Sequence, residues 1–141
     1  MSKRIICLVI SFLLAISVMN AFAETNLPGP AQPRYTYTWE VFAGLNISGT
    51  TATCLGKGRG MYSDKTTHVL VRLQQKSSES SYWTTIASWT ATANGTGTAL
   101  VNETCTVTTG YSYRVIVRCQ IKDSSGTVLE TVYRYSSVWT I

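Results

Sequence analysis

The 141-residue chain is poor in charged residues, in proline and above all in histidine. Only 13% of its residues are charged, three are prolines, and His68 is its single histidine. One histidine excludes a zinc site with two or more imidazoles within one chain, and the cysteines lack metal-ligand spacing. No Cys-x-x-Cys pair is present, which excludes thioredoxin-type redox chemistry. We therefore expect no metal and no cofactor.

The long apolar run of the chain lies at its N-terminus. Lys3 and Arg4 precede the run from Ile5 to Val18, and Ala21-Phe22-Ala23 supplies small residues at −3 and −1. This pattern is typical of a secretory signal peptide over residues 1–23. Cleavage leaves 118 residues, 10 of them basic and 7 acidic, without a second run long enough to span a bilayer. We expect a secreted protein, extracellular or associated with the cell envelope, with no transmembrane segment after cleavage.

The mature chain divides into a spacer and one domain. All three prolines lie between residues 28 and 33, so residues 24–33 read as a stiff, Pro-rich spacer before a domain at 34–141. Alternation of apolar and polar residues predicts strands rather than helices, with a turn at Asp123–Gly126. The expected strands cover residues 35–41, 52–60, 68–74, 82–92, 99–107, 111–121 and 127–135. About seven short strands with regular turn signals indicate an all-β, immunoglobulin-like sandwich.

The segment from Val107 to Val117 combines an apolar residue, a loop with Gly110 and a tyrosine that opens a Val-rich strand. It resembles the corner between strands E and F of fibronectin type III and bacterial Ig-like domains. The resemblance implies that Tyr113 packs in this corner, with its hydroxyl bonded to the loop backbone.

The whole mature chain is similar to a family of small secreted Ig-like proteins of Gram-positive bacteria that lack an assigned function. The segments that carry this resemblance are Ala52-Thr-Cys54, Leu73-Gln-Gln-Lys76, Trp83-Thr-Thr-Ile-Ala-Ser-Trp89, and Gly110-Tyr-Ser-Tyr-Arg114 before Asp123-Ser-Ser-Gly126. It implies a single Ig-like or fibronectin type III-like β-sandwich, and no particular activity.

Three cysteines, Cys54, Cys105 and Cys119, remain after cleavage and allow one internal disulfide. Cys54 and Cys119 both fall on inferred core faces, and the resemblance matches them to the bridge between strands B and F of Ig domains. We expect this pair. The alternatives are Cys54 with Cys105, or three reduced cysteines. We expect a monomer, although a spare exposed cysteine would allow a covalent dimer.

Catalysis finds little support in the residues. His68 falls on an outward alternation, and the seven acids are scattered over loops and separate strands. The run Gly56-Lys-Gly-Arg-Gly60 lacks the Gly-Lys-Ser/Thr ending of a phosphate-binding loop. Its inward glycines indicate that a bulky side chain, such as Trp83 or Trp89, packs across the strand. We therefore expect no enzyme, and a minimal hydrolase is the least favoured alternative.

The aromatic residues are expected mostly in the core, because Tyr35, Tyr37 and Trp39 alternate with polar residues. Trp139 is the expected exposed tryptophan. The acceptor triplets at Asn46, Asn94 and Asn102 would be unused in a bacterial host.

The best functional signal is a set of basic residues on outward strand positions. If the strands at 68–74, 111–121 and 127–135 share a sheet, one face carries Arg72, Lys76, Arg114, Arg118 and Lys122, with Gln74, Gln120 and Arg134 beside them and Glu130 as the nearby acid. Such a face either binds anions or only keeps the sheet soluble.

We expect an exported, non-catalytic binding or adhesion-type module. Its partner would be an unknown protein, a glycan or an anionic cell-wall polymer, and not nucleic acid. The alternative is a small secreted antagonist of the bacteriocin or inhibitor kind.

Overall fold

A computed structural model describes residues 34–141, so the expected signal peptide (1–23) and spacer (24–33) lie outside the described residues. Residues 35–141 form one compact unit of β-strands, and among the described residues no helix could cross a membrane. The strands are β1 (Thr38–Ser48), β2 (Thr51–Gly60), β3 (Thr66–Ser77), β4 (Thr84–Asn94), β5 (Thr98–Thr106), β6 (Tyr111–Lys122), β7 (Val128–Tyr135) and β8 (Trp139–Thr140).

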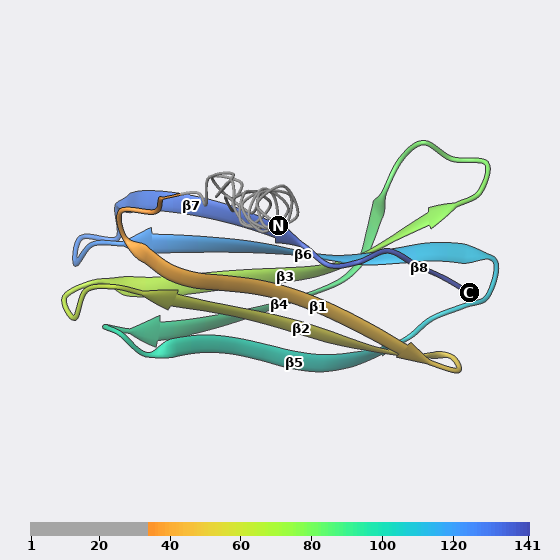
Figure 1. Ribbon diagram of the computed structural model, residues 1–141, viewed down its shortest axis with the longest axis horizontal. Coiled ribbons are helices and arrows are strands. Elements are labelled where there is room, and N and C mark those ends of the chain that lie inside the picture. Colours follow the sequence, from red (N-terminus) through yellow and green to blue (C-terminus); the bar gives the residue numbers. More distant parts are fainter. Residues whose placement is uncertain (1–33) are drawn as a thin grey trace, which may run out of the picture. The chain divides into compact units, whose positions relative to one another are not determined.

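These strands form two antiparallel sheets that pack face to face as a sandwich (Figure 1). One sheet has the order β1-β2-β5. The other has the order β4-β3-β6-β7, with the short β8 paired to β6. The expected all-β sandwich is confirmed, and the condition that β3, β6 and β7 share one sheet is met.

The core lies between the sheets, where alternate side chains of each strand point inward. On β6 the buried residues are Tyr113, Val115, Val117, Cys119 and Ile121, as the alternation predicted. They pack beside the buried side chains of β3, its antiparallel neighbour: Val69, Val71 and Leu73. Because the pleat has a period of two, burying this set turns every intervening side chain of β3 and β6 to the outside.

The glycines of β2 let the two sheets approach closely. A Cβ added at Gly58 would lie 2.6 Å from Cys119 Sγ and 2.7 Å from Val69 Cγ2, and one at Gly56 would overlap the Val71 side chain. The predicted packing role of these glycines is therefore correct. Their partners, however, are residues of the facing sheet rather than Trp83 or Trp89.

Tyr113 anchors the loop between β5 and β6. Its side chain is fully buried. Thr108 N donates a hydrogen bond to Tyr113 Oη (2.9 Å). The same hydroxyl donates a hydrogen bond to Thr108 O (2.8 Å). A single phenol thus satisfies both backbone groups of a loop residue, which fixes where β6 begins.

The prediction that Trp39 lies in the core is wrong. A register shift separates Thr38 from Glu40 in the pairing of β1 with β2. This bulge adds one residue, so Thr38 and Val41 take inward positions opposite Gly60 and Gly58, while Trp39 is left 67% exposed.

Replacing Gly56 with alanine should destabilise the fold by about 2 kcal/mol, because the new methyl group overpacks the interface against Val71. Urea unfolding of Gly56→Ala, Val71→Ala and the double variant would measure this. The double variant should cost at least about 1 kcal/mol less than the sum of the single costs, because each change relieves the other. Simple additivity would contradict the packing.

Replacing Tyr113 with phenylalanine should cost about 1–3 kcal/mol, because Thr108 N then loses its acceptor in a partly buried loop. Tyr133→Phe is the matched control, since Tyr133 is exposed on the outer side of β7. Its free energy of unfolding should change by less than about 0.5 kcal/mol. Equal losses for the two variants would show that the corner hydroxyl contributes nothing.

Candidate binding face

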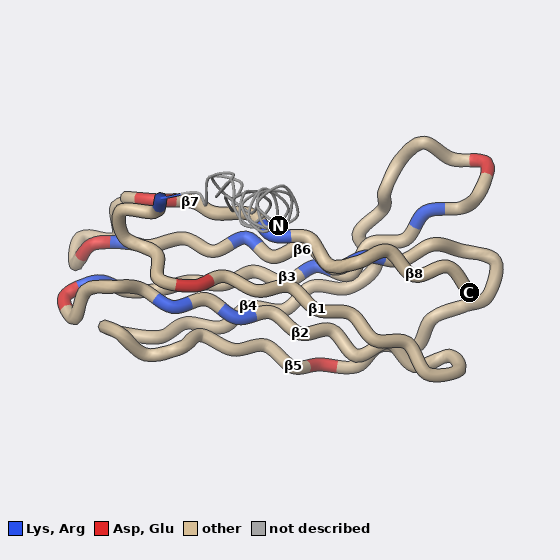
Figure 2. Tube along the Cα trace, viewed as in Figure 1, with Lys and Arg blue, Asp and Glu red and all other residues tan. Residues whose placement is uncertain are grey.

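The outer side of the five-stranded sheet gathers the basic residues that the sequence singled out. Arg72 and Lys76 lie on β3, and Arg114, Arg118 and Lys122 lie on β6, all at positions that alternate with the buried ones. Figure 2 shows basic residues spaced along both strands. We call these five residues the cationic face. Gln74 and Gln120 share it, opposite Arg114 and His68.

No acid neutralises the cationic face within residues 34–141. The two ion pairs of that range, Lys57–Glu40 and Lys65–Asp64, involve none of its members. Among β3, β4, β6 and β7, the single acidic residue is Glu130. The face therefore carries five formal positive charges without an internal counter-charge.

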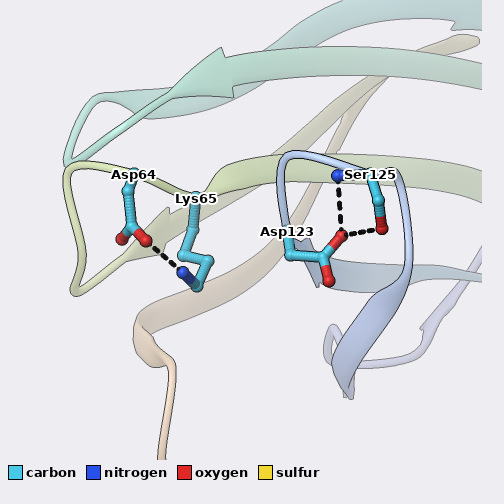
Figure 3. Close-up of polar contacts among 4 residues, drawn as sticks. All are labelled: Asp64, Lys65, Asp123 and Ser125. Carbon is cyan, nitrogen blue, oxygen red and sulfur yellow. Dashed lines mark hydrogen bonds and ion pairs between the residues drawn. The ribbon is translucent and has the colours of Figure 1, made fainter.

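The acids in the turns at one end of β3 and β6 have local partners (Figure 3). Asp123 accepts hydrogen bonds from Ser125 Oγ (2.6 Å), Ser125 N (2.9 Å) and Thr127 N (3.0 Å). These bonds lower the pKa of Asp123, and the bond from Ser125 Oγ has the largest effect. Asp64 pairs with Lys65, whose hydrogen bond lowers the pKa of Asp64. Both carboxylates are thus held within or beside their own turns.

Glu130 and Arg134 do not belong to the face, contrary to expectation. They pair with Ile121 and Val117, so they point to the core side of β7, at the edge of the sheet. Glu130 accepts hydrogen bonds from Thr36 N (2.8 Å), Tyr37 N (3.1 Å) and Thr38 Oγ1 (2.5 Å). Burial raises the pKa of Glu130, but these bonds outweigh it and the net direction is down. Glu130 fastens the start of β1 instead of balancing the face.

Arg114 makes cation–π contacts with two aromatic rings, Trp83 and Tyr135, which the sequence pattern did not connect with it. Its guanidinium carbon is 4.3 Å from the ring centroid of Trp83 and 5.0 Å from that of Tyr135. Arg114 Nε donates to Gln74 Oε1 (2.9 Å), and Lys76 Nζ lies 5.2 Å from the Trp83 centroid. Cation–π contact with both rings and the hydrogen bond to Gln74 orient the guanidinium. Trp83 directly precedes β4 and Tyr135 ends β7, so alternation within one strand gave no signal for these contacts.

His68 lies among the charges of the face, opposite Gln120 and between the rows of Arg118 and Lys122. Partial burial lowers the pKa of His68, and the charges of Lys122 and Arg118 lower it further. Arg118 Nε is buried and has no hydrogen-bond partner among the described residues. The field at His68 is therefore positive, as expected beside unneutralised cations.

A very small hollow lies on the cationic face. This hollow, between Leu70, Arg72, Ile116, Arg118 and Tyr133, holds about 10 Å³, room for about one water molecule. A wider, open hollow of about 420 Å³ lies elsewhere, against Trp39, Arg59, Met61 and Tyr62. Within residues 34–141, no three His, Cys, Asp or Glu residues gather as metal ligands. A charged face with so small a hollow suits an extended partner better than a small molecule.

The expected Cys54–Cys119 disulfide is not formed: Cys54, Cys105 and Cys119 are all free. The reason is an offset between the sheets. Cys119 faces Gly58, four residues along β2 from Cys54, which corresponds to about 13 Å. Cys54 and Cys105 occupy diagonal positions on neighbouring strands, since Cys105 pairs with Ala52. Burial raises the pKa of Cys54 to about 12 and that of Cys119 to about 11, so both stay protonated.

Comparison with known proteins identifies no relative. No protein-family model matches the chain, and no curated protein matches it.

The three thiols should differ in reactivity. In the native protein, a water-soluble disulfide reagent should leave Cys54 and Cys119 unmodified, because both are fully buried, and should reach at most the half-buried Cys105. In denaturant, all three should react. Peptide mapping of the modified cysteines checks this. Two thiols missing in denaturant would reveal a disulfide and contradict the structure.

Proposed function

We propose that the protein is an exported, non-catalytic binding module that acts at or outside the cell surface and takes an anionic partner on its cationic face. The observation that carries this proposal is charge without compensation: five basic side chains lie on one side of a sheet, and no acid in the described range pairs with them. A face that served solubility alone would gain stability from cross-strand pairs of opposite charge, and this one has none.

The neighbouring residues also favour binding. Leu70, Ile116 and Tyr133 lie between the cations, and Tyr133 and Tyr135 are about half exposed. Apolar and aromatic surface among fixed cations can contact the carbon skeleton of a partner while the cations meet its anionic groups. Arg114 is already oriented by Trp83 and Tyr135, which lowers the entropy lost on binding.

We further propose that the sandwich is of the Ig-like, fibronectin type III-like kind. Two features support this. The strand orders β1-β2-β5 and β4-β3-β6-β7 give a Greek-key sandwich in which the middle strands cross between sheets. The hydroxyl of Tyr113 also bonds back to the backbone five residues upstream, as in a tyrosine corner.

Neutralising the face should weaken attachment to the envelopes of the cells that secrete the protein. The variant combines Arg72→Gln, Arg114→Gln and Arg118→Gln, and sedimentation with isolated envelopes measures the bound fraction against concentration. We expect about tenfold weaker binding, because three exposed charge interactions are lost, and a smaller difference at high salt.

A control of equal net charge combines Lys57→Gln, Arg59→Gln and Lys65→Gln, none of which lies on the cationic face. Its binding should stay within about twofold of the unmodified protein. If the two triple variants bind alike, attachment depends on net charge or on another surface, and the proposed face is wrong. Thermal unfolding of each variant shows whether the fold is retained.

A further inference from the structure

The basic side chains of the cationic face alternate between β3 and β6 along the length of the two strands. The register between these strands has no irregularity, so each outward residue of β3 has one direct partner on β6. Six successive outward rows each hold one basic side chain, drawn alternately from β3 and β6. In order, the rows are Lys76 with Ser112, Arg114 with Gln74, Arg72 with Ile116, Arg118 with Leu70, His68 with Gln120, and Lys122 with Thr66.

This alternation solves a problem of charge repulsion. Two cations directly opposite each other would destabilise the sheet. Here each one faces a neutral partner, so the five Lys and Arg charges form a zigzag line with no more than one charge in each row. The row of His68 carries none at pH 7, because His68 is neutral there. Outward rows of an antiparallel sheet repeat every two residues, about 6.8 Å, so the six rows extend over about 34 Å. The lateral step between the two strands is only about 4.8 Å.

Such a spacing selects among linear polyanions. A strand places one outward residue every six backbone bonds. Any extended chain of single bonds that carries one anion per six bonds has a similar repeat, about 7 Å, since three backbone bonds span about 3.5 Å. In 1,3-linked poly(glycerol phosphate), six bonds separate successive phosphorus atoms. In 1,5-linked poly(ribitol phosphate), eight bonds separate them, which gives about 9 Å.

We propose that the cationic face binds a linear polyphosphodiester with one phosphate per six backbone bonds, of the 1,3-poly(glycerol phosphate) kind, laid along β3 and β6. This inference rests on the proposed anion-binding function and specifies its ligand. Each phosphate meets one row, and the carbon linkers pass over the apolar side chains of Leu70 and Ile116. The hollow beside Arg72 and Arg118 holds only about 10 Å³, too little for a monomer, whereas an extended chain needs no pocket.

Calorimetric titration with oligomers of defined length tests the match. For glycerol phosphate oligomers of two, four and six repeats at low salt, affinity should rise about twofold with each phosphate that gains an exposed ion pair to one of the five cations. Beyond six repeats the increase should become shallow, because the line of rows ends. For ribitol phosphate oligomers with the same number of phosphates, affinity should rise less with each repeat. Their phosphates are about 9 Å apart, so they do not match the spacing of about 6.8 Å between the rows.

Exchange variants separate spacing from charge. Arg72→Gln combined with Gln74→Arg keeps the net charge and composition but empties one row and puts two cations in the next, opposite each other. Leu70→Arg combined with Arg72→Leu empties the same row but puts the second cation in the row on its other side, opposite Arg118. Each should bind the six-repeat oligomer about threefold more weakly than the unmodified protein. Thermal unfolding shows whether each variant is folded. If one exchange variant does not fold, the other still tests the spacing.

His68 reports where the oligomer binds, because it is the only histidine of the chain and lies within the line. Its imidazole NMR signals, recorded on protein without a histidine tag, should shift on binding, and its pKa should rise as phosphates offset the charges of Arg118 and Lys122. Arg118, Lys122 and Gln120 on β6 and Thr92 on β4 are the groups that face it or flank it, and none is acidic.

The outcomes distinguish the two proposals. Equal affinity for glycerol and ribitol oligomers, or no loss in the exchange variants, would overturn the spacing inference and leave an anion-binding face. No binding of either oligomer, or binding that leaves the His68 signals unmoved, would overturn the inference about the ligand. The proposed function would fall only if the triple variant of the cationic face and its control also bound envelopes alike.

Discussion

The close approach of the two sheets at the glycines of β2 is the constraint on which the rest of this structure depends. Gly56 and Gly58 have no side chains, so Val71, Val117, Val69 and Cys119 pack directly against the β2 backbone. The apolar alternation of β3 and β6 decides which of their sides faces inward, and this contact brings that side against the β2 backbone. The contact also fixes the offset between sheets that sets Cys119 opposite Gly58 and away from Cys54. The free cysteines and the outward cations are thus consequences of the same packing.

That packing also determines which residues make up the cationic face. Once Val69, Val71 and Leu73 are buried on β3 and their partners on β6, every intervening side chain must point outward. The regular pairing then alternates Lys76, Arg114, Arg72 and Arg118 across the two strands. Because Asp64 and Asp123 are held by their own turns and Glu130 by the start of β1, these acids do not pair with the face, and its charge stays uncompensated. The fold therefore presents an ordered line of cations rather than a scattered excess.

The sequence pattern predicted burial correctly where a single strand decides which side chains face inward. The alternation from Tyr111 to Ile121 predicted the buried and outward residues of β6, and the five basic residues lie together as expected. It failed where a second element intervenes. The bulge between Thr38 and Glu40 turns Trp39 outward, and the pairing of β7 turns Arg134 and Glu130 to the core side. No local pattern could unite Trp83, Arg114 and Tyr135, which come from three different strands or their ends.

The sequence by itself determined the all-β class, the strand phases and the excess of basic residues on outward positions, because alternation and composition are local properties. Only the tertiary structure decided how the strands pair. Pairing sets the register between β3 and β6 and the offset between the sheets, and these are non-local quantities fixed by how glycines, valines and cysteines fit together. The spacing of the cations and the separation of Cys54 from Cys119 are therefore properties of the folded chain, which no single segment of the sequence contains.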